Sequence, residues 1–325
     1  MRRYALKRLL GMFPLLLGIT MISFAMMHLA PGEPAVTGQA FNPKVSSQDI
    51  ERLRSYYGLD QPLYVQYGQW LQRLVVLDFG ESFSDDHRPV LDKIVERLPV
   101  TLWVNVLAML FILLIAIPIG VMSAVKQDSW LDRGMTVVVF VAFAIPSFWL
   151  GLLLMMGLGV NLNWLPISGI HDYGWQQMSF WQQQVDFFKH LLLPVFVSAI
   201  GGLAGMSRFM RTGMLEVIRA DYITTARSMG VPEHDIRYRL ALKNAILPVI
   251  TLLGLSIPGL IGGSVIVEYL FSLPGMGRLF YEAILARDYT VVMGITVMGA
   301  VLTLMGNLMA DLAYAWADPR IRHHG

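Results

Sequence analysis

Few side chains in this sequence have the type and spacing needed for catalysis. Cysteine is absent, which excludes a cysteine nucleophile, a thiolate metal site and a disulfide. The seven histidines include no H-E-x-x-H pair, so we expect no metal site. No G-x-x-x-x-G-K-[ST] loop is present to cradle the phosphates of ATP, and no G-x-S-x-G motif occurs. We therefore assign no catalytic residue and expect no cofactor bound by this chain.

The charged stretch 219–248 stands out in a C-terminal half that is otherwise apolar. Asp221 is a candidate N-cap, because its carboxylate can accept hydrogen bonds from the free amides at a helix start. Tyr222, Ala226 and Met229 then fall on one face at helical spacing. The pattern predicts a short helix that begins at about this point.

A turn is expected to follow this helix. Gly230 can end the helix because glycine adopts the left-handed conformation without a Cβ clash. Pro232 is expected in the first turn of the next helix, followed by Glu233 and Asp235, whose charges favour a helix N-terminus. The stretch is therefore predicted to be a helix–turn–helix that projects from a membrane domain.

This stretch resembles the cytoplasmic E-A-A loop of bacterial ABC importer permeases, whose pattern is E-A-A, three residues, then Gly. The matching residues are Thr224, Thr225, Ala226 and Gly230, so the Glu and the first Ala are replaced. The general pattern later reads I-x-L-P, where this chain has Lys243 in place of the proline.

The departures are similar to the dipeptide and oligopeptide branch of the family. That branch has D-Y-I-x-T-A-R followed by A-L-x-N-A-x-L-P, which residues 221–227 and 241–248 match closely. Further matches cover nearly the whole chain and are weakest at 159–189. They lie at Leu29–Pro34, Gly58–Pro62, Asp78–Ser82, Leu273–Leu279, Asp288–Tyr289 and Ala317–Arg322.

The resemblance implies a transport subunit rather than an enzyme. Two ABC ATPase subunits would bind ATP and Mg²⁺, a second homologous permease would share the translocation path, and an extracytoplasmic substrate-binding protein would deliver the cargo. The turn 230–232 would pass ATPase motion into the fourth and fifth spans. The residues implied to couple to the ATPase are Asp221, Tyr222, Thr224, Thr225, Ala226, Arg227, Ser228, Met229, Gly230 and Pro232.

The composition agrees with a membrane protein. Of the 325 residues, 55% are hydrophobic and 15% charged, against roughly 45–50% and 25% in soluble domains. Six apolar runs approach the roughly 20 residues that a helix needs to cross a bilayer, and the fourth is the shortest. They are 9–29, 100–125, 135–158, 191–207, 246–267 and 291–314. The predicted fold is an all-α polytopic membrane protein with six transmembrane helices, and the resemblance implies the type I ABC importer permease fold.

Basic residues predict the orientation. Seven lie between Arg208 and Lys243, and others lie at the N-terminus, between the second and third spans and in the tail. The positive-inside rule places both termini and the coupling loop 208–246 in the cytoplasm of a bacterial inner membrane. The net charge of +2 is too small to suggest a nucleic-acid partner.

The expected organisation has four parts. Residues 1–29 form the N-terminal end and first span, 30–99 an external loop, 100–316 the permease core, and 317–325 a cytoplasmic tail. The external loop is predicted to be helical, with one helix that begins near Ser46 or Ser47 and ends at Gly58. A second amphipathic helix follows Pro62, with a stripe of Tyr67, Trp70, Leu71 and Leu74.

Polar groups and prolines inside the spans are candidates for the transport path. Asn105, Ser147 and Asn307 could line it, although hydrogen bonding between helices is the commoner use of such residues. Pro14, Pro118, Pro146, Pro194 and Pro258 should bend their spans unless neighbouring groups restore the lost backbone hydrogen bond.

Three functions remain open. The first is a peptide permease, and the second a permease of the same family that carries nickel or glutathione. The third is an ion-coupled secondary transporter or an intramembrane enzyme. Asp311 is the only acidic residue in the last apolar run and no internal repeat is apparent, whereas ion-coupled transporters usually show several intramembrane carboxylates or repeats.

Overall fold

The computed structural model describes residues 2–29, 48, 51, 52, 55, 58–84 and 86–317, and their side chains except at 2–9, 257, 258 and 310–317. Most of the helix predicted from Ser46 or Ser47 to Gly58, residues 30–34, the Asp311 side chain and residues 318–325 lie outside this part. The chain divides into two compact units. One comprises residues 1–101, 261–265 and 275–325, and the other 102–260 and 266–274.

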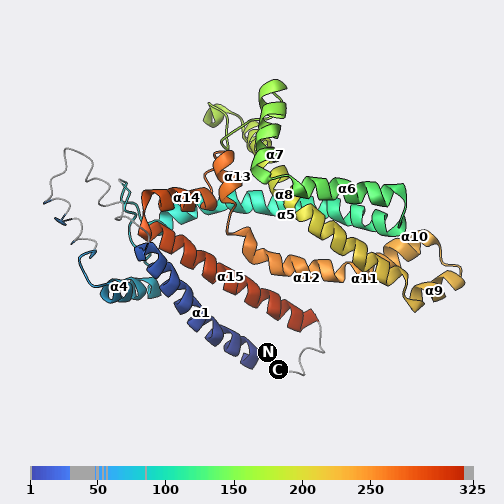
Figure 1. Ribbon diagram of the computed structural model, residues 1–325, viewed down its shortest axis with the longest axis horizontal. Helices are drawn as coiled ribbons and strands as arrows, with labels where there is room; N and C mark the ends of the chain where they lie inside the picture. The colour runs from blue at the N-terminus through green and yellow to red at the C-terminus, as the bar shows by residue number, and fades with distance from the viewer. Residues whose placement is uncertain are drawn as a thin grey trace. The chain divides into compact units, whose positions relative to one another are not determined.

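The first unit is built on α1 (Arg2–Leu29), α14 (Met276–Ala286) and α15 (Tyr289–Ala317). α1 and α15 lie side by side and run in opposite directions (Figure 1). A core beside them joins Phe79, the start of α5 (Val90–Val125) and the buried sides of α14 and α15. The close approach is possible because Gly294 has no Cβ, which would lie 2.6 Å from Val90 Cγ1.

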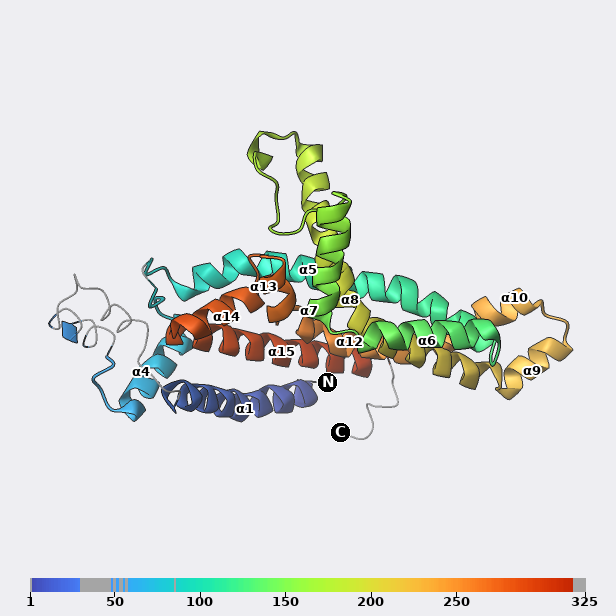
Figure 2. The same cartoon turned by 45° about the horizontal axis from the view of Figure 1, so that its top comes forward.

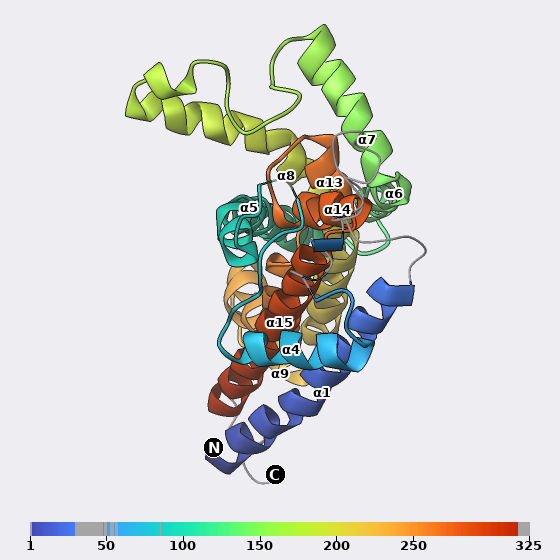
Figure 3. The same cartoon turned by 90° about the vertical axis from the view of Figure 1, so that its left-hand side faces the viewer.

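The predicted amphipathic helix of the external loop is α4 (Leu63–Val75), which begins directly after Pro62. It crosses the end of α1 at a steep angle (Figure 3), where the Tyr67 hydroxyl and Thr20 Oγ1 are 2.9 Å apart. Trp70 and Leu74 pack against the core of the first unit. This prediction is therefore confirmed.

The second unit contains the rest of α5 and the long helix α8 (Phe180–Ile218). α8 begins with a capping box in which the Ser179 and Gln182 side chains satisfy each other's backbone amides. The fourth apolar run is the shortest of the six, but the helix that contains it, α8, has 39 residues. The apolar run covers only its middle, because the helix continues into polar residues at both ends.

The third predicted span is broken at Pro146. α6 (Trp130–Ala144) and α7 (Ser147–Leu154, continued by the π-helical η2 Met155–Asn161) meet at an angle of 96°. Figure 2 shows α7 turning away from α6 and running beside the first half of α8. The fixed φ and missing amide of proline explain the break.

The remainder of the second unit is a series of short helices. They are η3 (Trp175–Gln177), α9 (Asp221–Ser228), α10 (Glu233–Asp235), η4 (Ile236–Ala241), α11 (Leu242–Ala245), α12 (Leu247–Ser256), η5 (Ile257–Leu260) and α13 (Val265–Leu270). The predicted span 246–267 is thus helical only to about residue 260 before the chain breaks. Residue 265 of α13 is assigned to the first unit.

Five described helices are long and apolar enough to cross a membrane, or six when the bent pair at 130–161 counts as one span. Among the described residues no strand forms, apart from one isolated bridge between Glu81 and Pro89. The prediction of an all-α polytopic membrane protein is confirmed.

Candidate functional site

The candidate site is α9 with the turn that follows it. The N-cap is Ala220, which makes no side-chain capping bond, and Asp221 is the first residue of the helix. The prediction that Asp221 caps the helix is therefore wrong by one position. Its carboxylate is still in the first turn, where a negative charge interacts favourably with the helix dipole.

Gly230 ends α9 as predicted. Its φ is +80°, in the left-handed region. The Val231 amide donates to the Ala226 carbonyl at 3.2 Å and the Gly230 amide to the Arg227 carbonyl at 3.0 Å. These two bonds form a Schellman motif. Pro232 is the N-cap residue of α10, with ψ of 139°, and not a first-turn residue as predicted.

α9 uses its apolar face to pack on its own chain. Ile223 is fully buried and Ala226 is 4% exposed. Both belong to a cluster, here called the coupling core, with Met210 and Met214 of α8. The other buried members are Val121, Ala124, Ile236, Ala241, Ala245 and Val249. The coupling core therefore joins α9 to α5, α8 and the helices after the turn.

The burial of Ala226 corrects the predicted face. Tyr222 is 43% exposed and Met229 is 72% exposed, so neither shares the buried position of Ala226. The predicted grouping is wrong because Ala226 shares its buried face with Ile223 and not with Tyr222 and Met229. Ala226 therefore supports α9 from beneath, and the other side of the helix is exposed.

The outer side of α9 is a mostly polar surface that includes two large apolar side chains, Tyr222 and Met229. Its exposed members are Asp221, Tyr222, Thr224, Thr225, Arg227, Ser228, Met229 and Gly230. The Thr225 and Ser228 hydroxyls donate to carbonyls four residues earlier, which fixes their rotamers. The Asn244 amide donates to the Tyr222 hydroxyl at 2.8 Å. Met229 is the most exposed large apolar side chain of this surface.

An ion pair closes the turn. Arg227 Nε donates to Glu233 Oε1 at 2.6 Å, and Arg237 Nε lies 3.5 Å from Glu233 Oε2. The Arg227 and Glu233 side chains are 44% and 45% exposed, so solvent and salt screen the pair and its contribution is small. Together with Gly230, it fixes the direction in which the chain leaves α9.

The three candidate path residues have separate environments. Asn105 Nδ2 donates to the Leu260 carbonyl at 2.6 Å, so its amide is engaged by the backbone where η5 ends. Ser147 is the first residue of α7 and is half-buried, and Asn307 is exposed. Their role in lining a path stays a prediction, and Asn105 has a structural role as well.

Two sequence motifs that lie far apart meet in the first unit. The buried Ser82 hydroxyl donates to Asp288 Oδ2 at 2.5 Å. Lys93 Nζ donates to Ser82 Oγ at 2.8 Å. Lys93 also lies 2.7 Å from Asp86 Oδ1. Burial alone would raise the pKa of the Asp86 carboxyl, but hydrogen bonds from Lys93, Ser84 and the amide of residue 88 hold this pKa below its ordinary value.

Replacing Asp288 by Ala is expected to destabilise the first unit. The carboxylate also accepts from the Val291 amide at 3.2 Å, so it acts as the N-cap of α15. The substitution removes this cap and leaves the buried Ser82 hydroxyl without its acceptor, at a cost of about 2–4 kcal/mol. Thermal unfolding of the purified chain should show a lower midpoint, with Asp288→Asn intermediate because asparagine still caps. A midpoint for Asp288→Ala equal to wild type would contradict this role.

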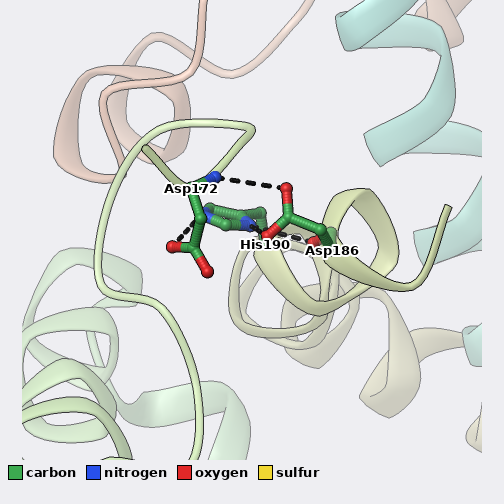
Figure 4. A group of neighbouring side chains, drawn as sticks. All are labelled: Asp172, Asp186 and His190. Carbon is green, nitrogen blue, oxygen red and sulfur yellow. Dashed lines mark hydrogen bonds and ion pairs between the residues drawn. The ribbon is translucent and has the colours of Figure 1, made fainter. Parts of the chain in front are cut away.

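A buried histidine lies between two carboxylates near the start of α8 (Figure 4). Ligand atoms of Asp172, Asp186 and His190 come within 4.8 Å of one another. His190 Nδ1 donates to the Asp186 carbonyl at 2.9 Å, whereas Nε2 faces Asp172 Oδ1 at 3.7 Å. The two carboxylates come closest to different nitrogens of the ring, and the three groups form a clamp between the connection at 159–179 and α8.

Sequence reasoning missed this clamp because Asp172 and Asp186 are 14 residues apart. The available signal was the spacing of Asp186 and His190, which lie one helical turn apart. Next to Asp172, the His171 ring stacks on the Trp175 ring, with ring centres 3.9 Å apart. These contacts order a connection in which the family resemblance is weakest.

A cavity of about 500 Å³ lies in the first unit. Side chains of α1, α4, the 78–83 segment and α15 line it, including Phe24, Trp70, Arg73, Glu81 and Tyr289. The lining mixes aromatic rings with side chains of both signs of charge. Its walls come from helices that the sequence did not place together.

The comparisons with known proteins agree with this architecture. Residues 116–323 match the family model described as binding-protein-dependent transport system inner membrane component. Residues 1–105 match the N-terminal model of such membrane components. The fold is similar to that of a MetNI methionine ABC transporter solved in inward-facing conformations, with a TM-score of 0.51 and 17% identity. The similarity covers 68% of this chain and 95% of that one.

Curated relatives span the whole chain. The oligopeptide transport system permease protein AppB of Bacillus subtilis is 45% identical, over 99% of this chain and all of that protein. The dipeptide permease DppB of Alkalihalophilus pseudofirmus is 35% identical, and the glutathione permease GsiC of Salmonella paratyphi A is 36% identical; each similarity covers 99% of this chain and all of the relative. The predicted resemblance is confirmed: the chain belongs to the family of inner membrane components of binding-protein-dependent transport systems, the permease subunits of ABC importers.

Proposed function

We propose that this chain carries dipeptides or oligopeptides across the bacterial inner membrane, with a second homologous permease that shares the path. The whole-length similarity to an oligopeptide permease carries the proposal. Glutathione is the alternative cargo favoured by a specific observation, since a glutathione permease is also similar over its whole length. Nickel remains an alternative within the family.

The proposed partners are two ABC ATPase subunits and an extracytoplasmic substrate-binding protein. ATP and Mg²⁺ would bind to the ATPases, because this chain has no phosphate-cradling loop. The outer surface of α9 would seat in a groove on one ATPase. Closure of the ATPases would then displace α9, and with it the coupling core.

The cargo is tested by uptake. A strain that lacks only this chain should lose uptake of labelled dipeptides and oligopeptides, and regain it with the wild-type gene. Parallel assays with glutathione and Ni²⁺ distinguish the alternatives. Loss of glutathione or nickel uptake alone, with peptide uptake intact, would contradict the peptide proposal.

The ATPase contact is tested at Met229. Replacing it by Glu places a charge on the most exposed apolar side chain of α9 and leaves the coupling core unchanged. We expect the ATPase subunits to be lost from the purified complex while the chain still inserts normally. Trp130→Glu is a control, since Trp130 is also highly exposed, at 85%, but lies on α6. Equal loss of the ATPases in both variants would argue against a specific contact at α9.

The orientation is tested by single-cysteine labelling, which is straightforward because the native chain has no cysteine. Asp60→Cys is expected to react with an impermeant reagent from outside the cell. Arg239→Cys, whose native side chain is 78% exposed, should react only after the membrane is permeabilised. The reverse pattern would invert the proposed topology.

A further inference from the structure

α6 is absent from the packed core beneath α9. The buried and partly buried members of the coupling core come from α5, α8, α9, the turn at 231, and the helices from η4 to α12. No described residue of α6 is among them. α5 and α8 are in backbone contact there, because a Cβ on Gly120 would lie 2.6 Å from Met210 Cβ. Motion of α9 therefore reaches α5 and α8 through apolar packing, whereas α6, which lies beside α8, is outside this core and has a separate connection to it.

That connection is a buried ion pair at the start of α6. Arg211 of α8 donates to Asp132 through Nε at 2.9 Å and through Nη2 at 2.7 Å. The Asp132 side chain is 5% exposed and that of Arg211 is 30% exposed. A two-point bond between a guanidinium and a carboxylate fixes orientation as well as distance.

Asp132 also binds two further elements. The Ser123 hydroxyl on α5 hydrogen-bonds its carboxylate, and the Asp128 amide donates to Oδ2 at 3.0 Å. Its own amide donates to the N-cap Ser129 at 3.2 Å. One carboxylate thus joins the first turn of α6 to α5, to α8 and to the turn before α6.

The rest of α6 lies beside α8, with Leu131, Met135, Val139 and Ala142 partly buried, whereas Val137, Val138, Phe140, Val141 and Phe143 are exposed. The pair of Asp132 and Arg211 is the two-point polar contact in this packing, and it fixes the orientation of α6 on α8. At its other end α6 stops at the 96° bend, beyond which α7 packs beside α8. An exposed hydrogen bond from Arg219 to Gln127, 2.9 Å long, supports the same junction from the end of α8.

We propose that Asp132 and Arg211 are positioning residues that make α6 move together with α9 and the coupling core during the transport cycle. The inference rests on the proposed function, in which the ATPases move α9. Without the pair, α9 would still bind the ATPase and still move α5 and α8, but α6 would lag behind. ATP hydrolysis would then be less tightly linked to transport.

The test uses the complete complex in proteoliposomes, with transport and ATP hydrolysis measured on the same sample. Arg211→Gln should retain the ATPase subunits, because the surface of α9 is unchanged. It should reduce cargo transported per ATP by about fivefold to tenfold. Arg211→Lys should be intermediate, since lysine keeps the charge but not the two-point geometry. Arg133→Gln, which removes an exposed arginine beside Asp132, is the control and should resemble wild type.

The double variant Asp132→Asn with Arg211→Gln separates this role from simple stability. In Arg211→Gln the Asp132 carboxylate is left buried without its partner. If this were the only defect, the double variant, which removes both charges, would regain both stability and transport per ATP. We expect thermal stability to recover while transport per ATP stays low. Recovery of wild-type transport per ATP in the double variant would overturn the proposal.

A distance measurement tests the motion itself. Spin labels at Val138→Cys and Arg239→Cys report the separation of α6 from η4 when the partner subunits carry no cysteine. In otherwise wild-type complexes the distance distribution should be the same with and without trapped ATP, whereas in Arg211→Gln it should change. An unchanged distribution in Arg211→Gln would overturn the inference. Failure of the wild-type chain to assemble with ATPases or to transport cargo would instead refute the proposed function.

Discussion

Replacing Ala226 by Asp is expected to abolish transport by disrupting the chain's own fold around α9. Ala226 is 4% exposed and packs with Ile223, Met210 and Met214. A carboxylate there would be buried among apolar side chains without a partner. Such a charge costs about 3 kcal/mol or more, and α9 would detach rather than accept it. The ATPase subunits should be lost from the purified complex, and the 219–248 segment should become sensitive to protease.

Ala226→Ser is the matched control. Its hydroxyl is small and can donate to the carbonyl four residues earlier, as those of Thr225 and Ser228 do. We expect transport within about twofold of wild type, which corresponds to less than 0.5 kcal/mol. If Ala226 faced an ATPase groove instead, Ala226→Asp would lose the ATPases while the segment stayed resistant to protease. That result would contradict the burial of Ala226.

The sequence was sufficient where a local rule decides the conformation. Gly230 is left-handed because a helix that ends in a Schellman motif needs a residue that tolerates positive φ, which glycine does without a Cβ clash. α4 starts after Pro62 and partly buries its apolar stripe, because its amphipathic pattern is clear. The break at Pro146 follows from the fixed φ of proline. In each case the information lies within a few residues of the feature.

The face of α9 could not be predicted in the same way. Its apolar side chains Tyr222, Ile223, Ala226 and Met229 are spread around an eight-residue helix, and two surfaces compete for them. One is the core of the chain and the other is a partner that the sequence does not contain. Grouping Tyr222, Ala226 and Met229 by spacing therefore chose the wrong side for Ala226.

Contacts between distant segments were also beyond the sequence. Ser82 and Asp288 were each recognised as part of a motif, but the hydrogen bond between them spans 206 residues. Arg211 was considered only as one positive charge among seven, whereas its place opposite Asp132 depends on how α6 packs on α8. α8 extends beyond its apolar run at both ends, because hydropathy reports the membrane-spanning part of a helix and not where its backbone bonds end.

The second large effect is expected from Gly230→Val, through backbone conformation alone. The φ of Gly230 is +80°, and a Cβ built there meets nothing within 4 Å. Space is therefore available, but a β-branched residue disfavours this conformation by about 1–2 kcal/mol. Relief of the strain would extend α9 or redirect the chain, which would break the Val231-to-Ala226 hydrogen bond and move Glu233 away from Arg227. Transport should fall about tenfold or more, while membrane insertion stays normal.

Gly230→Asn separates conformation from the mere presence of a side chain. Asparagine is among the residues that most readily adopt the left-handed region, so this variant should keep most transport and most ATPase binding. Uptake, co-purified ATPase and ATP hydrolysis stimulated by the binding protein should all rank wild type first, Asn second and Val last. If Asn and Val were equally inactive, a side chain at this position would be blocking the ATPase surface. If both retained full uptake, the turn at Gly230 would have no part in coupling.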